Sequence, residues 1–247
     1  MTYLRAFLAR VGPTATLVII LAVGLLIAIL LSAAVAQVYD SITDTDGVSG
    51  LDQPILDWVI TLRSPGVDAA VTAYTNVAGP IGMPIIAVAA LVAMGIRWRS
   101  WTPVILIIAA GGGSLLLTIS GKDLIGRVRP PLNEAIPPYE YSPSFPSGHT
   151  LNAVVVAGTI AYLLVLHQTS KLARTLTIGV ATVFAVTIGL SRVFLGHHWF
   201  TDVLAGFILG LAWLAIIITA HRLMHILRAR RRALRRPADP TPESSLL

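Results

Sequence analysis

The sequence predicts an all-α membrane protein, a bundle of six transmembrane helices. Of its 247 residues, 55% are hydrophobic and only 12% are charged, and the mean hydropathy is +0.78. Soluble domains carry about 25% charged residues. Six runs of the chain lack any charged side chain, and most reach the roughly 20 residues that cross a bilayer as a helix. These runs are too long, and alternate too little, for membrane β-strands.

The predicted helices follow from these runs in chain order. The uncharged runs cover residues 11–39, 69–96, 100–121, 141–170, 175–191 and 203–221. We place the spans at 14–37, 78–96, 101–121, 148–168, 173–194 and 201–221. All six belong to one domain, residues 1–236, whose motif-rich core is 122–202. Residues 237–247 are polar and rich in proline, so we expect a disordered cytoplasmic tail.

The basic residues orient this bundle. Thirteen of the 18 flank the spans on one side: Arg5, Arg10, Arg97, Arg99, Lys171, Arg174, Arg222, Arg228, Arg230, Arg231, Arg232, Arg235 and Arg236. The positive-inside rule assigns that side to the cytoplasm, so both termini are expected there. The basic segment after the last span either contacts anionic lipids of the inner leaflet or acts only as a topology signal.

Two features of the N-terminal region have two interpretations each. The first apolar run contains Ala34 and Ala36 at the spacing of a signal-peptide cleavage site, but its length favours a retained anchor. Residues 50–63 predict an amphipathic helix on the outer leaflet. Its apolar positions recur at helical spacing: Leu51, Ile55, Trp58 or Val59, and Leu62. This helix is either a lid over a site or a cap on the bundle.

Several classes of function lack their sequence features. The chain has no cysteine, which excludes a disulfide framework and thiolate catalysis. It has no P-loop and no nucleic-acid-binding motif, so no nucleic-acid partner is expected. Glycines at 111–113, and Gly206 with Gly210, allow helices to pack closely. They serve packing within one bundle or a dimer seam, so the oligomeric state stays open.

Three short polar segments interrupt the apolar pattern, at residues 122–130, 146–149 and 191–202. Each lies at the outer end of a predicted span. Charged side chains at membrane depth are costly unless they are paired or functional. Because the three segments share one predicted depth, we expect them to form a single site.

The third segment supplies a candidate nucleophile. His198 and Asp202 are four residues apart and share a face on a helix. The carboxylate can accept a hydrogen bond from one imidazole nitrogen and leave the other nitrogen free to attack. His197 is the rival nucleophile, but its partner at the same spacing is Thr201, which has no charge.

The second segment supplies a candidate anion site. Ser147 and Gly148 begin a predicted helix, where free backbone amides and the helix dipole favour negative charge. His149 would lie beside the bound anion and could protonate a leaving oxygen.

The remaining cations complete the predicted site. Lys122, Arg129 and Arg192 match the charge and geometry of a phosphoryl group. We expect Arg127 to be an additional cation that binds a headgroup or pairs with Asp123 or Glu134. No metal or other cofactor is expected, because cations and amides already fill the roles of a metal ion. Neither Asp123 nor Glu140 lies at a spacing typical of metal ligands.

The three segments resemble the signature of the PAP2 (type 2 phosphatidic acid phosphatase) superfamily, Lys-x6-Arg-Pro, Pro-Ser-Gly-His and Ser-Arg-x5-His-x3-Asp. Every position of that signature is present in this chain, within about 80 residues: Lys122, Arg129, Pro130, Pro146, Ser147, Gly148, His149, Ser191, Arg192, His198 and Asp202. The resemblance implies that His198 is the nucleophile, Asp202 its partner and His149 the general acid. It also implies that the phosphate is bound, without a metal, by Lys122, Arg129, Ser147, Gly148 and Arg192.

Residues and resemblance together predict an integral-membrane phosphatase whose site faces outward. Expected substrates are undecaprenyl diphosphate, phosphatidic acid or phosphatidylglycerol phosphate, cleaved through a phosphohistidine intermediate. A lipid phosphotransferase would use the same site and pass the phosphoryl group to another lipid. A transporter or flippase, with charges lining a path, is the alternative from a different class.

Overall fold

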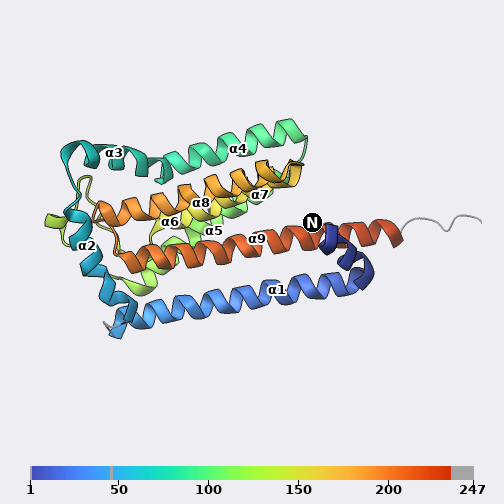
Figure 1. The fold of residues 1–247 in the computed structure, drawn as a ribbon, viewed down its shortest axis with the longest axis horizontal. Coiled ribbons are helices and arrows are strands. Elements are labelled where there is room, and N and C mark those ends of the chain that lie inside the picture. Colours follow the sequence, from blue (N-terminus) through green and yellow to red (C-terminus); the bar gives the residue numbers. More distant parts are fainter. Residues whose placement is uncertain (1, 45–46, 235–247) are drawn as a thin grey trace, which may run out of the picture.

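The computed structural model describes residues 2–44 and 47–234, and this part of the chain is helical and has no strand. The helices are α1 (Thr2–Asp44), α2 (Asp52–Ile60), α3 (Pro65–Thr75), α4 (Gly82–Trp98), α5 (Thr102–Ile125), α6 (Gly148–Asn152), α7 (Gly158–His167), α8 (Lys171–Phe194) and α9 (Phe200–Leu234). Figure 1 shows the long helices side by side, with α2 and α3 at one end. We call this the polar end. The expected tail, 237–247, lies outside the described residues.

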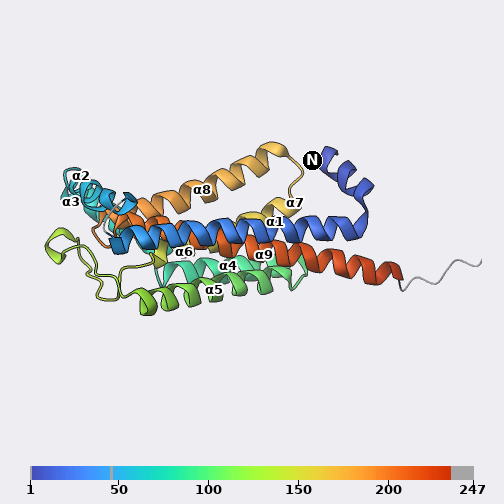
Figure 2. The ribbon, with the colours of Figure 1, turned by 90° about the horizontal axis from the view of Figure 1, so that it is seen from below.

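The prediction of an all-α bundle with six spans is confirmed. Five helical segments in the described ranges are long and apolar enough to cross a membrane: Leu21–Thr43, Thr102–Ile125, Gly148–His167, Lys171–Phe194 and Phe200–Arg228. A sixth span is a bent pair, Pro65–Ala78 and Gly82–Trp98, whose halves meet at 45°. The bend falls at Pro80, which cannot donate a backbone hydrogen bond. Figure 2 shows that α1 begins, and α9 ends, at the end opposite α2.

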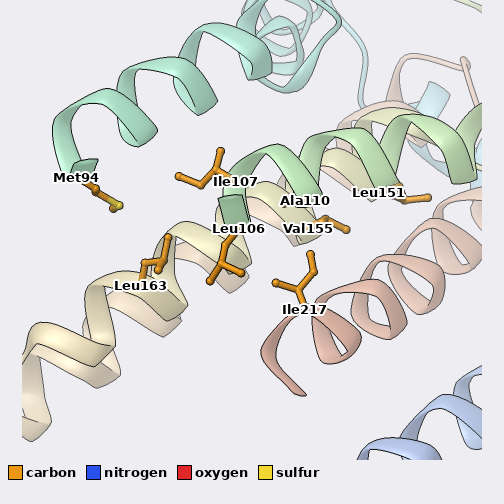
Figure 3. Packing of buried hydrophobic residues seen from close by; sticks show 8 residues of the cluster. All are labelled: Met94, Leu106, Ile107, Ala110, Leu151, Val155, Leu163 and Ile217. Atoms are coloured by element: carbon orange, nitrogen blue, oxygen red, sulfur yellow. The ribbon is translucent and has the colours of Figure 1, made fainter. Parts of the chain in front are cut away.

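The span that carries the second polar segment lies at the centre of the bundle. Half of its most apolar stretch is buried, more than in any other candidate span of the described chain. It comprises α6, a π-helical turn (Ala153–Ala157) and α7. Figure 3 shows the apolar core around it, which takes side chains from α4, α5, this span and α9: Met94, Leu106, Ile107, Ala110, Leu151, Val155, Leu163 and Ile217. The core fixes the depth and orientation of the helix that begins at Gly148.

Close helix packing in the bundle depends on three of the glycines. A Cβ atom added to Gly113 would lie 2.1 Å from the indole of Trp213, and one at Gly206 would lie 2.9 Å from the carbonyl oxygen of Ser147. At Gly210 it would lie 2.8 Å from Val154. These contacts lie within one chain, so Gly113, Gly206 and Gly210 serve packing inside the bundle, whereas a Cβ atom at Gly111 or Gly112 would meet no atom within 4 Å. The short distance from Gly206 to Ser147 also brings α9 against the start of α6.

The predicted amphipathic helix is present as a short 3₁₀ turn (Gly47–Leu51) and α2, but its buried face is different from the expected one. The inward side chains are Asp52, Leu56 and Val59, whereas Trp58 is 62% exposed. Leu51 and Leu62 are also about half exposed. Leu56 and Val59 pack on Val193 and Val203 of α8 and α9, and Asp52 makes polar contacts described below. The helix therefore caps the polar end of the bundle.

Candidate active site

The fold brings the three polar segments together at the polar end. Lys122 lies in the last turn of α5, and Arg127 and Arg129 follow in the next loop. Ser147 and His149 lie at the start of α6, and Arg192 lies in the last turn of α8. His198 is in the turn before α9, and Asp202 is in its first turn. Four separate parts of the chain thus converge on one small volume.

The imidazole of His198 is buried and lies between a carboxylate and an arginine. Its Nδ1 is 3.6 Å from Oδ2 of Asp202, which is too long for a hydrogen bond. The hydroxyl of Ser144 bridges the two side chains. Its Oγ lies 3.4 Å from Nδ1 of His198 and donates to Oδ2 of Asp202 at 2.5 Å. Nδ1 therefore carries the proton, and the lone pair of Nε2 points towards Arg129, whose Nη1 is 3.4 Å away.

Ser144 is a site residue that sequence reasoning missed. The expected direct hydrogen bond between His198 and Asp202 is replaced by a relay through this serine, which is completely buried. Its one sequence signal is its position three residues before Ser147, in a loop without regular secondary structure. Helical spacing correctly places the imidazole and carboxylate near each other, but spacing carries no information about a side chain inserted from a loop.

The role expected for Arg127 is wrong. It pairs with neither Asp123 nor Glu134. Its guanidinium donates to Asp202 at 2.6 Å and to Asp52 of α2 at 2.7 Å. Asp52 also accepts hydrogen bonds from the backbone amide and the hydroxyl of Thr201, at 2.8 and 2.7 Å. Arg127 thus connects the carboxylate behind His198 to the cap of the bundle.

Asp202 receives donors on both carboxylate oxygens. Besides Arg127 on Oδ1 and Ser144 on Oδ2, the backbone amide of Trp199 donates to Oδ2 at 2.9 Å. Hydrogen bonds to the charged form favour an ionised carboxylate, even though this one has no exposed surface. The relay to His198 therefore ends on a carboxylate whose two oxygens are both held by donors.

Arg129 and Arg192 form the cationic face of the site together with Lys122, and we refer to these three residues as the cationic cluster. Arg192 is 2% exposed and donates to Thr75 of α3 at 3.4 Å. Arg129 donates to the carbonyl oxygens of Ser142, at 2.6 Å, and His197. Lys122 donates to the hydroxyl of Ser142 at 3.1 Å and to the Pro143 carbonyl. The cluster is therefore held by loop carbonyls and by α3.

A fourth charged group, Glu140, lies within this cluster. Its Oε2 is 2.8 Å from Nη2 of Arg129, and its Oε1 forms an ion pair with Arg192. Burial raises the pKa of Glu140, but the neighbouring charges, Arg192 and Arg129 among them, outweigh it and hold that pKa at about 2. The carboxylate is therefore ionised at neutral pH.

The start of α6 supplies backbone donors, as expected. Ser147 has the extended backbone of an N-cap residue, but its side chain makes no capping bond to the helix. Its Oγ accepts from Thr150 at 2.9 Å instead. The first amides of a helix have no intrahelical acceptor, so those that follow Ser147 are available to an anion. Nε2 of His149 faces Gly79, where a Cβ atom would lie 3.2 Å from it.

The two adjacent histidines differ in their environment. Nε2 of His197 lies 2.7 Å from the carbonyl oxygen of Ile136, which anchors that ring to the loop. Burial, and then Arg129 and Arg192, lower the pKa of His198 well below its ordinary value. His198 is therefore neutral at physiological pH, which is the state that a nucleophile requires. Within the described ranges, no three His, Asp or Glu side chains are arranged as a metal site.

Comparisons with known proteins agree on one family. The family model described as PAP2 superfamily matches residues 99–224. Phosphatidylglycerophosphatase B of Bacillus subtilis (strain 168) is 36% identical over 170 residues, which cover 68% of this chain and 81% of that protein. The crystal structure of the first transmembrane PAP2 type phosphatidylglycerolphosphate phosphatase from Bacillus subtilis superposes with a TM-score of 0.73 and 31% identity, over 79% of this chain and 96% of that one.

A more distant structure shares the fold alone. The crystal structure of Aquifex aeolicus LpxE superposes with a TM-score of 0.54 at 23% identity, over 68% of this chain and 94% of that chain. The family match covers residues 99–224, which include all three polar segments. The chain therefore belongs to the PAP2 superfamily.

Proposed function

We propose that this protein hydrolyses a lipid phosphate monoester at the outer face of the membrane, through a phosphohistidine formed on His198. The chain is an integral-membrane lipid phosphatase of the PAP2 superfamily. The observation that carries the mechanism is the relay from His198 through Ser144 to Asp202, which leaves Nε2 free beside the cationic cluster.

In the first step, Nε2 of His198 attacks phosphorus and the bond from phosphorus to the lipid oxygen breaks. His149 donates a proton to that oxygen, so the lipid leaves as an alcohol. The proton on Nδ1 of His198 stays directed at Ser144 and Asp202, which stabilises the positive charge that develops on the ring. In the second step, water attacks the phosphohistidine, His149 accepts the proton from the water, and orthophosphate is released.

The phosphoryl oxygens are bound by preorganised donors. Arg129 and Arg192 offer guanidinium groups that contact the two carboxylate oxygens of Glu140, and Lys122 adds a third charge. The amides after Ser147, including that of Gly148, complete the set. Such donors stabilise the charge that develops in the transition state, and removing one costs about 10²–10³-fold in turnover in comparable sites. These cations fill the role of a metal ion, so the proposed reaction has no metal cofactor.

Phosphatidylglycerol phosphate is the first substrate to test. The support is that the relative with 36% identity is named phosphatidylglycerophosphatase B, and that the structural neighbour with 31% identity is a phosphatidylglycerolphosphate phosphatase. Phosphatidic acid and undecaprenyl diphosphate present the same terminal phosphate group. The outward orientation of the site is supported by the 13 basic residues assigned to the opposite side of the membrane.

The function is tested with purified protein in detergent. Phosphate release is measured for phosphatidylglycerol phosphate, phosphatidic acid and undecaprenyl diphosphate, with His198→Ala as the inactive control. Rapid quench with ³²P-labelled substrate should trap an acid-labile label on the peptide that contains His198. Label on His149 or His197 would contradict the assignment of the nucleophile. Inversion at phosphorus without any enzyme-bound phosphate would rule out the covalent intermediate.

The same experiments separate the alternatives. A phosphotransferase would produce a newly phosphorylated lipid in place of free orthophosphate. A transporter without catalysis would release no phosphate in detergent, where no membrane compartments exist.

A further inference from the structure

Glu140 contacts two of the arginines to which the proposed function assigns phosphate binding. Its two carboxylate oxygens each contact a different arginine of the cationic cluster, Arg129 at 2.8 Å and Arg192 in a shorter ion pair. Its Oε1 is also 3.9 Å from Nδ1 of His197. In the proposed function these guanidinium groups bind phosphoryl oxygens. A carboxylate and a phosphate cannot use the same N–H groups at the same time.

The cluster has a donor that Glu140 does not satisfy. The buried Nε of Arg192 lacks a hydrogen-bond partner within the described chain. A carboxylate offers two oxygens in one plane, whereas a tetrahedral oxyanion offers more oxygens in several directions. Glu140 therefore neutralises the cluster only in part, as a substitute for a larger anion.

The loop around Glu140 is anchored on both sides but not at its centre. On one side, the amide of Ile136 donates to the Leu195 carbonyl at 2.9 Å. On the other side, Arg129 and Lys122 contact Ser142, and the amide of Ser144 donates to the Arg127 carbonyl at 2.8 Å. Between these anchors, the side chain of Glu140 makes the polar contacts that reach the bundle. The flanking Tyr139 and Tyr141 are 43% and 82% exposed.

This arrangement lets the carboxylate leave without unfolding the loop. The side chain of Glu140 is 30% exposed, whereas that of Arg192 is 2% exposed. Glu140 thus enters the cluster from the solvent side, while Arg192 is held by Thr75 of α3 and Arg129 by the carbonyl oxygens of Ser142 and His197. Rotation of one side chain, or a shift of residues 137–141 between their anchors, would vacate the site.

We propose that Glu140 is an internal counter-ion that occupies the phosphate site of the resting enzyme and is exchanged for the substrate phosphate. The inference rests on the proposed function, because it gives the cationic cluster a phosphate to bind. A tethered carboxylate competes at a high effective concentration, so it weakens the binding of every oxyanion by a common factor. It also compensates buried arginine charges while no substrate is present, because unpaired buried charge is destabilising.

Two opposite effects of one substitution follow from this proposal. Glu140→Gln keeps the shape of the side chain and removes its charge. The variant should bind tungstate, an inert tetrahedral oxyanion, at least about 10-fold more tightly than wild type, which corresponds to about 1.4 kcal/mol. In the absence of oxyanion, the same variant should have a lower thermal midpoint than wild type. A saturating concentration of tungstate should recover the difference in midpoint.

The matched control is Asp123→Asn, which removes a carboxylate from an exposed residue next to Lys122. Both its tungstate affinity and its midpoint should equal those of wild type. If Glu140→Gln binds tungstate more weakly or equally, Glu140 is a brace that positions Arg129 and Arg192, and the proposal fails. A brace predicts losses in both affinity and stability, whereas a competitor predicts a gain in affinity with a loss in stability.

A second measurement needs no variant. Carboxyl labelling by a water-soluble carbodiimide, followed by mass spectrometry, reports how accessible Glu140 is in wild type. Saturating tungstate should increase the labelling rate of Glu140 and leave that of Asp123 unchanged. Unchanged or slower labelling of Glu140 would overturn the exchange. Both measurements detect tungstate binding and do not require turnover. If no lipid tested releases phosphate, the proposed function is contradicted, but these two measurements still test the exchange of Glu140.

Discussion

Replacing Arg127 by methionine should impair catalysis, although Arg127 is not among the proposed phosphate-binding residues. Arg127 holds Asp202, the carboxylate that orients His198 through Ser144. Methionine keeps much of the length and apolar surface of the arginine side chain and removes its charge. The substitution deletes the contacts of 2.6 and 2.7 Å to Asp202 and Asp52, and also a 2.7 Å hydrogen bond to Thr201. Both carboxylates are buried, at 0% and 5% exposure. Neither can gain water in exchange for the lost partner.

Removing one partner of a buried ion pair costs about 3–5 kcal/mol, because the other charge stays buried without compensation. For a protein of this size, 1 kcal/mol shifts the thermal midpoint by about 2–4 °C, so we expect a decrease of about 6–20 °C. Asp202 also loses one of its orienting donors, and the relay through Ser144 to His198 becomes less well aligned. Turnover should fall at least about 10-fold, or about 1.4 kcal/mol of transition-state stabilisation.

The assay combines thermal denaturation in detergent with phosphate release below the midpoint of the variant. The matched control is Arg222→Met in α9, whose guanidinium lies over the ring of Tyr162 at 5.8 Å, far from the polar end. Its midpoint should change by no more than about 2 °C, as for surface substitutions generally. A double-mutant cycle of Arg127→Met with Asp52→Asn should show coupling of about 0.5–3 kcal/mol.

If Arg127→Met melts within about 2 °C of wild type and keeps full turnover, the contact between Arg127 and Asp202 is needed for neither stability nor catalysis. That result would mean that Ser144 and the amide of Trp199 satisfy Asp202 on their own. Additive effects in the cycle would show that α2 and the catalytic relay are independent, and that α2 is only a cap.

Three further predictions concern topology, metal and charge geometry. A cysteine at Asn133 should react with an impermeant thiol reagent on intact cells, and one at Ser170 should not; the reverse labelling would invert the membrane orientation. Activity should persist in EDTA and be blocked by vanadate, which mimics the pentacoordinate phosphoryl group; complete loss in EDTA with rescue by Mg²⁺ would contradict a mechanism based on arginine and lysine. Arg192→Lys should lose at least about 10-fold in turnover, because an ammonium cannot make the two-pronged contact of a guanidinium. A folded Arg192→Lys variant that retains wild-type turnover would show that Arg192 serves packing instead.

The spans were predictable because hydropathy is a property of local sequence. Uncharged runs identified all six, and the structure places helices at each of them. Gly79 and Pro80 lie at the 45° bend between α3 and α4. The contacts that the bend creates could not be predicted from these two residues. The bend brings Thr75 against Arg192 and leaves room for His149 beside Gly79. Those contacts depend on packing between helices that are distant in the chain.

The buried face of α2 shows why local pattern was insufficient there. The apolar positions at 51, 55, 58 or 59, and 62 are a plausible inward face; Val59 does point inward, but its buried neighbours are Asp52 and Leu56. A buried aspartate contradicts the rule that polar residues face out, and only its partners explain it. Arg127 and the amide of Thr201 hold Asp52, and these lie 75 and 149 residues away in the chain.

The sequence by itself determined the bundle, the gathering of its polar segments at one end and the closeness of His198 to Asp202. These features depend on residue type and on spacings of a few residues. The tertiary structure decided the partners: Ser144 between the imidazole and the carboxylate, Arg127 behind Asp202, and Glu140 among the arginines. Each of these side chains comes from the loop between α5 and α6, which has little regular structure and no periodicity to interpret. Its path is set by contacts with distant helix ends, so the assignment of each charge to its partner exists only in the folded chain.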